Sequence, residues 1–433
     1  MKRPLVITLL VIALAFVCLG IGAVIFFTAN GFQTNNPFDR RNISSVLEES
    51  KTLKVDTGKP LTLKVADDAG DVTITGADVN TVQVKAIKTA YDSSQARADQ
   101  EVKGIKYTVE QNGNSITLKY ELPKSMNFDN KVNTVDFVLT VPNETTVDVN
   151  GSFGKVDVTG TKGNVNIDNN FGGVTVKNIE GTLAIKNDSG AITATAIKAV
   201  SADIDLQSSF GGITLEEADG GNITLHSSSG AINLSNVRAT GDLKTKSDFG
   251  GISYENGSAD SLTVESSSGK VFLVKLMVSK EIKVENDFGE IELQRALAGS
   301  YDLHTSSGAI TVDGAKNKLK AYTDFGGIII KNAESVMLDL KTSSGTIQFN
   351  GSLGEGPHSV KSDFGGIDFA LPADTKLNVD LTTDFGAIRS DIPLTVTLDG
   401  STDKNHQIGS MNGGGDQLTI KTSNGNIDIK AIK

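Results

Sequence analysis

A short motif recurs along more than half of this 433-residue chain at a nearly constant interval, and this repeat restricts the fold more than any other feature. Clear copies are Asp248-Phe249-Gly250-Gly251-Ile252 and Ser267-Ser268-Gly269-Lys270-Val271. The repeated glycines divide the stretch from 154 to 386 into twelve nearly equal intervals. They are Gly154, Gly172, Gly190, Gly211, Gly230, Gly250, Gly269, Gly289, Gly308, Gly326, Gly345, Gly365 and Gly386, with outlying copies at Gly70 and Gly425.

Apolar residues keep fixed positions around each glycine. The second residue after it is Ile or Val in all thirteen copies, and the residues four after, five before and seven before are mostly apolar. The residue three before is Ser, Thr or Asn in nearly every copy, as in Ser247 and Thr305. This alternation at period two predicts a strand, a glycine turn, a second strand and a second turn in each unit.

One such unit cannot bury its apolar side, whereas stacked units can, so a fixed period of this size indicates a solenoid. We therefore predict an all-β protein, a parallel β-solenoid (β-helix) of ~19-residue repeats. The Ile/Val position would form an internal ladder, and the Ser/Thr/Asn position would hydrogen-bond along the stack at a corner. We expect the turn glycines where φ must be positive.

A second regularity concerns the residue before each glycine, which alternates between Phe and Ser, as in Phe249, Ser268 and Phe288. Two arrangements fit this alternation. In the first, each coil holds one repeat, and a Phe ring fills corner space above and below a coil with Ser. In the second, a coil holds two repeats, and Phe stacks directly on Phe. We favour the short coil, because two strands and two tight turns account for the whole length of one repeat.

The N-terminal segment predicts a membrane anchor. Residues 4–28 are uncharged and long enough to span a bilayer, and Lys2 and Arg3 favour a cytoplasmic N-terminus. A cleaved signal peptide is the alternative, with Thr28-Ala29-Asn30 as a poor cleavage site; bulky residues before Cys18, the single cysteine, disfavour a lipoprotein. The chain then lies in the cell membrane as a single-pass protein with its remainder outside the cytoplasm. Its net charge of −11 argues against nucleic acid as a partner.

Composition divides the chain into five parts: an anchor (1–30), a polar linker (31–50), an irregular β-rich N-terminal portion (51–150), the repeat solenoid (151–398), and a loop with a C-terminal capping coil (399–433). Within 51–150, the run from Ser93 to Gln100 suits a short helix capped by one of its serines. Strands are expected at 105–109, 115–121 and 135–141. At the other end, 399–416 reads as a glycine-rich loop, and 418–429 as an atypical final coil that covers the open end of the stack.

No group of residues predicts chemistry. The Asp-Phe-Gly triplets recur five times without the other motifs of a kinase, so they read as turns, and no calcium-binding repeat accompanies them. His226 and His304 share a position that elsewhere holds either sign of charge, which indicates a solvated face. Asp203 and Asp205, the nearest carboxylate pair, also read as a solvated face. We therefore assign no catalytic, cofactor-binding or metal-binding residue, expect no cofactor, and do not expect an enzyme.

The Ser-Ser-Gly-Ala-Ile and Asp-Phe-Gly-Gly-Ile turns, the Val-Pro-Asn at 141–143 and the closing Thr-Ser-Asn-Gly-Asn-Ile at 422–427 resemble the bacterial putative-adhesin β-strand repeat family (domain of unknown function 4097) over about 50–433. The resemblance implies a surface-exposed β-solenoid beside a membrane anchor. We expect an extracellular binding, adhesion or scaffolding module of the cell envelope, with a surface protein or a glycan as ligand. An envelope-stress sensor acting through a membrane partner is the alternative, and a carbohydrate-active β-helix enzyme is a weaker one.

Overall fold

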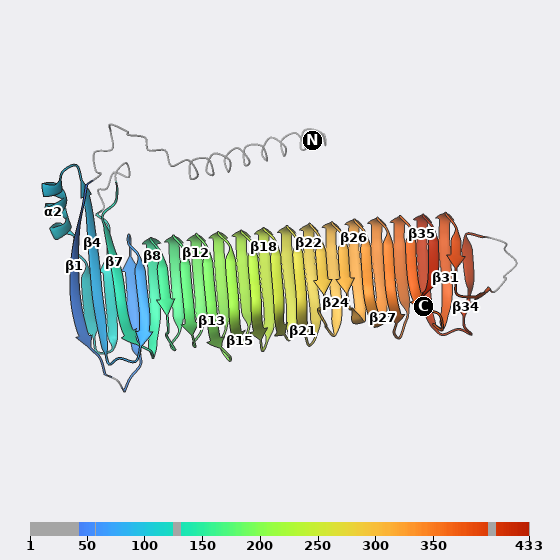
Figure 1. The fold of residues 1–433 in the computed structure, drawn as a ribbon, viewed down its shortest axis with the longest axis horizontal. Coiled ribbons are helices and arrows are strands. Elements are labelled where there is room, and N and C mark those ends of the chain that lie inside the picture. The colour runs from blue at the N-terminus through green and yellow to red at the C-terminus, as the bar shows by residue number, and fades with distance from the viewer. Residues whose placement is uncertain (1–42, 57, 124–130, 397–403, 433) are drawn as a thin grey trace.

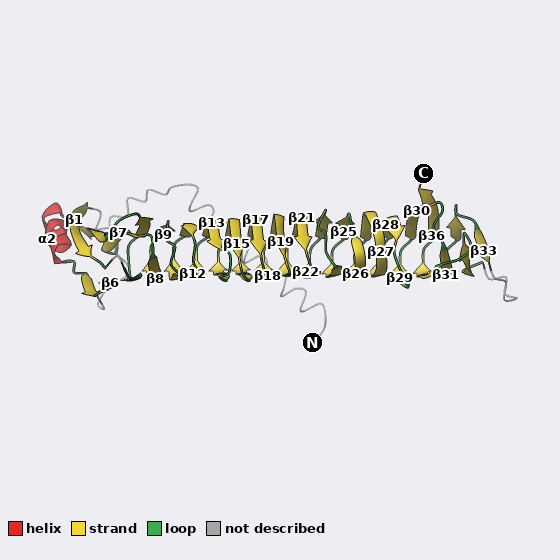
Figure 2. Ribbon diagram, turned by 90° about the horizontal axis from the view of Figure 1, so that it is seen from below, coloured by secondary structure: helices red, strands yellow, loops and turns green. Residues whose placement is uncertain are grey.

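The protein is an elongated β-solenoid of two flat layers, as Figures 1 and 2 show from two directions. This computed structural model describes residues 43–56, 58–123, 131–396 and 404–432. The expected anchor at 1–30 lies outside the described residues and is not tested. Within the part that the structure describes, no helix has both the length and the apolar character needed to cross a membrane.

The two layers hold alternate strands of the chain, and all neighbours within a layer of the repeat region are parallel. Layer one contains the strands that end at the glycine turn: β8 (Thr145–Phe153), β10 (Val165–Phe171), β12 (Leu183–Ser189), β14 (Ile204–Phe210), β16 (Ile223–Ser229), β18 (Asp242–Phe249), β20 (Ser261–Ser268), β22 (Glu281–Phe288), β24 (Ser300–Ser307), β26 (Lys316–Phe325), the second half of β27 (Ile328–Ser344) and β29 (His358–Phe364). Layer two contains the strands that follow the turn: β9 (Val156–Thr159), β11 (Val174–Ile179), β13 (Ile192–Ala199), β15 (Ile213–Gly220), β17 (Ile232–Ala239), β19 (Ile252–Ala259), β21 (Val271–Val278), β23 (Ile291–Gln294), β25 (Ile310–Asp313), the first half of β27, β28 (Ile347–Leu353) and β30 (Ile367–Pro372).

Strand register decides between the two coil lengths. Ser229 pairs with Phe249, and Ser268 pairs with Phe288, so each Phe unit lies beside a Ser unit in space. Likewise Ile252 pairs with Ile232 on one side and Val271 on the other. Each repeat is therefore one coil, which confirms the short-coil arrangement.

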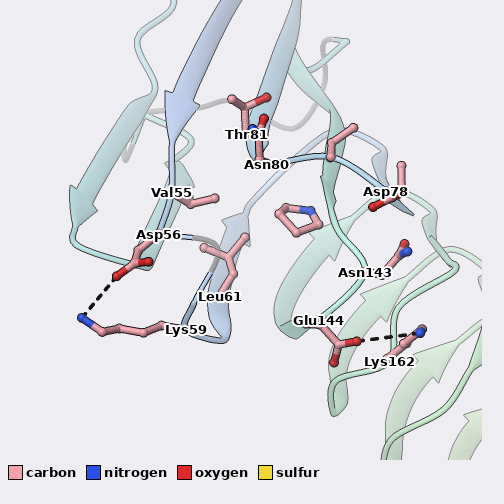
Figure 3. A pocket seen from close by; sticks show the side chains of 13 residues that line it. Val55, Asp56, Lys59, Leu61, Asp78, Asn80, Thr81, Asn143, Glu144 and Lys162 are labelled. Carbon is pink, nitrogen blue, oxygen red and sulfur yellow. Dashed lines mark ion pairs between the residues drawn. The ribbon is translucent and has the colours of Figure 1, made fainter.

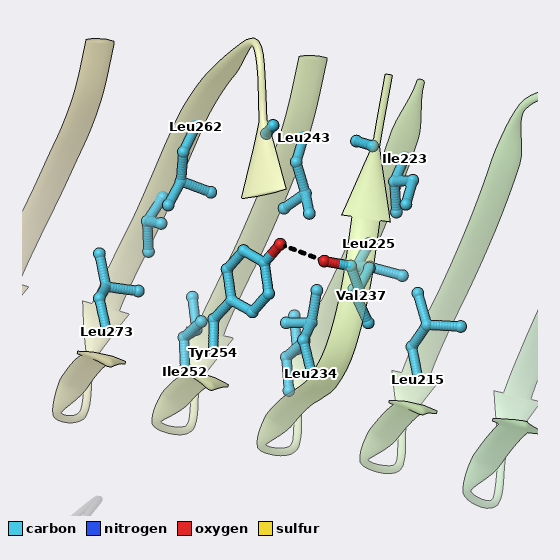
Figure 4. Close-up of a cluster of buried hydrophobic side chains, with 14 of the residues drawn as sticks. Leu215, Ile223, Leu225, Leu234, Val237, Leu243, Ile252, Tyr254, Leu262 and Leu273 are labelled. Atoms are coloured by element: carbon cyan, nitrogen blue, oxygen red, sulfur yellow. Dashed lines mark hydrogen bonds between the residues drawn. The ribbon is translucent and has the colours of Figure 1, made fainter. Parts of the chain in front are cut away.

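The core is the space between the layers, filled by the apolar positions of the repeat. The Ile/Val ladder is buried along the stack, except for Ile388, which is half-buried. Tyr254 is also fully buried, and its hydroxyl donates to the Val237 carbonyl at 2.7 Å among surrounding leucines, as Figure 4 shows. Burial of a phenol is tolerated here because its one polar atom finds a partner.

The polar ladder beside the turn is also confirmed. Ser247 donates to the Gly230 carbonyl at 3.0 Å, and Thr305 donates to the Gly289 carbonyl at 3.1 Å. Thr342 repeats this contact with Gly326 at 2.9 Å. Each side chain thus satisfies the turn carbonyl of the preceding coil, which the tight stacking keeps away from water.

The predicted positive φ is confirmed for nine of the thirteen turn glycines, but it does not explain all of them. The other four, Gly211, Gly230, Gly326 and Gly386, do not lie in the left-handed region. The thirteen turn glycines, which we call the glycine ladder, share a close approach between neighbouring coils. A Cβ at Gly211 would lie 2.1 Å from the Gly190 carbonyl oxygen, and one at Gly326 would lie 2.0 Å from that of Gly308. Glycine is needed because the backbone of the preceding coil occupies the Cβ position.

The N-terminal end is a cap of antiparallel strands and one helix. β1 (Ile43–Lys54) pairs along its whole length with β4 (Thr81–Asp92), and helix α2 (Gln95–Gly104) packs against both. The polar linker predicted to reach residue 50 is therefore wrong for residues 43–50, where backbone pairing with β4 fixes a strand. The helix prediction is confirmed, and Ser94 caps it by accepting from the Arg97 N–H at 3.4 Å.

Within this cap, the first coil does not lie at the edge. It consists of β2 (Leu61–Asp67) and β3 (Val72–Ala77), which pair on one side with β8 and β9. On the other side they pair with β6 (Ser115–Tyr120) and β7 (Thr134–Pro142). β5 (Thr108–Asn112) adds a short antiparallel edge to β6, so the strand expected at 105–109 begins and ends later.

The C-terminal end shows the same insertion, and here the prediction is wrong. The last coil, β35 (Asp416–Asn424) and β36 (Ile427–Ile432), lies between the coil of β29 and β30 and that of β31 (Leu377–Phe385) and β32 (Ile388–Ser390). The open end is covered instead by β34 (His406–Met411), antiparallel to β31 and to β33 (Leu394–Val396). The segment read as a loop at 399–416 therefore contains the covering strand.

Candidate binding surface

One edge of the solenoid carries a row of exposed phenylalanine side chains. We call it the phenylalanine row, and its exposed fractions run from 47% at Phe153 to 78% at Phe385. Its members are Phe153, Phe171, Phe210, Phe249, Phe288, Phe325, Phe364 and Phe385. Except for the first two rings, which stack at 5.1 Å between centroids, each Phe is separated from the next by a coil with Ser or Asn.

The exposure of these rings corrects the expectation that they fill corner space. Successive side chains of a strand point to opposite faces, and Thr245 and Ser247 of β18 are buried. By this alternation Phe249, two residues after Ser247, would also point inward. The pairing of β18 with β16 is regular as far as Ser247, omits Asp248 and resumes at Phe249. The chain therefore begins to bend at Asp248, and this bend turns the Phe249 ring out to solvent.

The C-terminal insertion extends the alternation. Along the sequence, Phe364 and Phe385 belong to successive repeats, so the alternation stops there when the chain is followed in order. In space, Asn424 pairs with Phe364 on one side and with Phe385 on the other. The inserted coil thus supplies a small polar residue between two rings, and the two-coil period continues to the end of the stack.

A strip of polar side chains borders the row on the outer face of layer one. The residue before each ring is Asp in the five Phe coils nearest the C-terminal end, and Ser in most of the intervening coils. Lys246 lies 3.9 Å from Asp248, and Lys361 lies 2.9 Å from Asp363. These exposed pairs neutralise part of the acidic charge and add little stability.

Next to this strip lies a small aromatic cluster. The His304 and Tyr322 rings stack with centroids 4.9 Å apart, and the Lys341 ammonium lies 5.1 Å from the Tyr322 centroid. The Tyr322 hydroxyl donates to Asp324, and this bond is the main reason why the pKa of Tyr322 is raised. The cluster therefore widens the aromatic surface beside Phe325.

The other residues weighed from the sequence lie in separate places. His226 contacts the Ser228 hydroxyl at 3.5 Å on the outer face of layer one. Asp203 accepts from the Asn222 backbone N–H at 2.9 Å, and Asp205 accepts from the Gln207 side chain, which are turn and surface contacts. Among the described residues, no three His, Cys, Asp or Glu side chains gather closely enough to hold a metal ion.

One outward position of layer two breaks the pattern and was missed. Phe272 takes a place that is Ser253 in one neighbouring coil and Glu292 in the other. The Lys270 ammonium lies 5.3 Å from its ring centroid and pairs with Glu292. A signal was present, since an aromatic residue replaced the polar residues usual at this step of the repeat.

A hollow with a volume of about 680 Å³ lies at the N-terminal cap (Figure 3). Four of the five charged residues that line it form two pairs, Lys59 with Asp56 at 3.3 Å and Lys162 with Glu144 at 3.8 Å, and the fifth is Asp78. All four are largely exposed. The charges of these four residues are therefore already matched by partners within the protein.

The chain is similar to one protein family and to two solved structures. The chain matches the profile of the toastrack family DUF4097 over residues 62–256 and 252–430. It is similar to the crystal structure of a "putative adhesin" from Bacteroides fragilis, with 16% identity and a TM-score of 0.30 over 66% of this chain and 97% of that one. It is also similar to that of a "putative cell adhesion protein" from Clostridium sporogenes, with 11% identity and a TM-score of 0.18 over 90% and 100%. No curated protein matches.

The two family matches cover nearly all of the solenoid, from the first inserted coil to the last. They confirm the resemblance inferred from the turn motifs. The chain belongs to the toastrack DUF4097 family.

Proposed function

We propose that this protein is a membrane-anchored, extracytoplasmic binding module that serves adhesion or scaffolding at the cell surface. The phenylalanine row carries the proposal. Eight rings that are 47–78% exposed present roughly 1,000 Å² of apolar area in total, since a Phe side chain has about 200 Å². Exposed apolar surface concentrated on one side of a soluble protein marks an interaction site, and here the aromatic rings all line one edge.

The solenoid suits multivalent contact. Its parallel coils hold equivalent side chains at a constant spacing, so one edge repeats the same small contact many times. Each contact alone would be weak, but linked contacts on a rigid frame add without a further cost of ordering the protein. This arrangement favours an extended or repetitive partner over a small molecule.

The proposed location rests on the sequence. The uncharged run at 4–28 would hold the chain in the membrane, with Lys2 and Arg3 on the cytoplasmic side and the solenoid outside. The acidic balance of the chain would keep the solenoid away from anionic lipid head groups.

Two measurements on cells test these points. Protease added to intact cells that express the full chain should digest the solenoid, and deletion of residues 51–433 should reduce attachment of the cells to surfaces or to one another. Protection from the protease contradicts the proposed location. Unchanged attachment together with an altered envelope-stress response would favour the sensor alternative instead.

A further inference from the structure

The phenylalanine row has a period that points to a class of ligand. Successive rings from Phe171 to Phe385 are two coils apart, which is about 10 Å for coils separated by ~4.8 Å. Between them lie small polar residues, such as Ser268 and Ser307. A ligand that matches this edge presents an apolar face once every two coils and polar groups between.

A linear chain of β-1,4-linked pyranose sugars has these properties. Each sugar is turned by half a rotation relative to the last, so the same apolar C–H face recurs every second ring, at a distance close to two coil spacings. Aromatic rings provide flat apolar surfaces on which such faces can pack. We propose that the phenylalanine row binds a linear, neutral, β-1,4-linked glycan. This inference rests on the proposed binding function and specifies the class of its ligand.

The polar strip beside the row fits the hydroxyl groups of such a chain. Asp287 and Asp384 are exposed, and Asp248, Asp324 and Asp363 are half-buried on the outer face. Their carboxylates accept hydrogen bonds, while the serines of the intervening coils can both donate and accept. Hydrogen bonds to charged acceptors are stronger than those between neutral groups, so the strip would fix the orientation of the sugar rings.

The charge of the edge selects against other occupants. An acidic polysaccharide would meet the row of aspartates, whose charge the lysines beside Asp248 and Asp363 only partly neutralise. A second copy of this chain is disfavoured too. If the phenylalanine rows of two antiparallel copies interdigitated, the carboxylates of one copy would alternate with those of the other at about one coil spacing, ~4.8 Å. Like charges at that distance repel one another. A neutral ligand avoids this repulsion.

The aromatic cluster of His304, Tyr322 and Lys341 marks the part of the row where contact would be widest. Tyr322 is two residues before Asp324 and three before Phe325, so the Tyr322 ring and the row lie on the two sides of one carboxylate. A glycan lying on the row could therefore contact the edge of the tyrosine ring as well. We expect the tightest binding around this coil.

The spacing of the phenylalanine row can be tested separately from the number of its rings. The loss variant combines Phe249→Ser and Phe325→Ser, which leaves no three rings in succession at the two-coil spacing. The shifted variant adds Ser268→Phe and Ser344→Phe, which restores the number of rings but not the period. Ser and Phe each occur at this position in neighbouring coils, so both variants are compatible with the fold, and circular dichroism verifies this.

The assay is calorimetric titration of the full chain, in a detergent without a sugar head group, with cellohexaose and chitohexaose. A hexasaccharide spans three two-coil periods. We expect the wild type to bind at least one of them, and both variants to bind it roughly ten-fold more weakly, because each set of three ring positions then keeps at most two rings in register. Maltohexaose, whose α-linkages curve the chain, should bind no better than the variants do.

Three results overturn the inference. They are a wild type that binds neither hexasaccharide, a shifted variant that binds as tightly as the wild type, and sedimentation showing a wild-type dimer that the loss variant dissolves. If cells that display the chain attach to surfaces while the purified chain binds neither sugar, the glycan inference fails and the proposed function stands. If deletion of the solenoid leaves attachment unchanged, the proposed function fails by itself.

Discussion

The glycine ladder gives the most discriminating prediction about stability, because two explanations of it predict opposite signs. Gly211 lies outside the left-handed region, so a purely conformational account treats Gly211→Ala as harmless or stabilising by ~0.4–1 kcal/mol. The close approach predicts the reverse. The new Cβ would lie 2.1 Å from the Gly190 carbonyl oxygen and 3.0 Å from the Ala191 nitrogen.

The size of the effect follows from the geometry. The two backbones must separate by about 1 Å before the contact becomes an ordinary one. Two hydrogen bonds flank this point, from the Gly190 N–H to the Phe210 carbonyl at 3.1 Å and from the Ile192 N–H to the Gly212 carbonyl at 3.0 Å. Losing both costs about 2 kcal/mol, and over-packing alone costs about 1–3 kcal/mol. We expect a destabilisation of about 3 kcal/mol.

Hydrogen exchange read by mass spectrometry is the suitable assay, because a solenoid can open locally without unfolding as a whole. Protection of the backbone amides should fall in β12 and β14 of layer one and in β13 and β15 of layer two, and remain in distant coils. Gly173→Ala is the matched control: its Cβ would lie 3.6 Å from the Ala191 oxygen, and equivalent positions already carry Ala. If Gly211→Ala exchanges like the control, close coil contact is not the reason for the ladder.

Three further predictions concern the core and the two ends. Tyr254→Phe removes the buried hydrogen bond to the Val237 carbonyl and should cost about 1–3 kcal/mol in denaturant unfolding. Burial raises the pKa of Asp67 to about 8, so the folded chain keeps a proton that the unfolded chain releases above pH ~4. Asp67 should therefore cost stability increasingly from pH 4 to 8, and the Tm gain of Asp67→Asn should be larger at pH 8 than at pH 4; an equal gain at both contradicts this. Removing residues 416–433 should expose the edges of two coils, and hydrogen exchange should show lost protection in β29 and β31 alike.

Much of the fold could be predicted from the repeat itself. The invariant Ile/Val position identifies the inward face, the spacing sets the coil length, and the Ser/Thr/Asn position foretells the bonds seen from Ser247 and Thr305. These features are local, since each depends on one coil and its two neighbours. Pattern reasoning works here because every level of the sequence agrees with the same structure.

The order of the coils at both ends could not be predicted in the same way. The inward pattern of 418–429 matches any position in the stack, so periodicity does not choose between the end and the place beside β29. That choice depends on how the connecting segments fold outside the repeat, such as β33 and β34 at the C-terminal end. The direction of the Phe249 ring was missed for a different reason, because strand parity gives the wrong side where the bend begins before the glycine.

The inserted terminal coils have a consequence for resistance to force. In a simple stack, the last coil is held on one side only, so a pull on the chain end peels coils away in turn. Here β35 and β36 have parallel partners on both sides, and β2 and β3 do as well. Pulling on the C-terminus must therefore break two ladders of hydrogen bonds at once. A surface protein built this way would resist unravelling from its C-terminus, because the chain does not end there at a free edge.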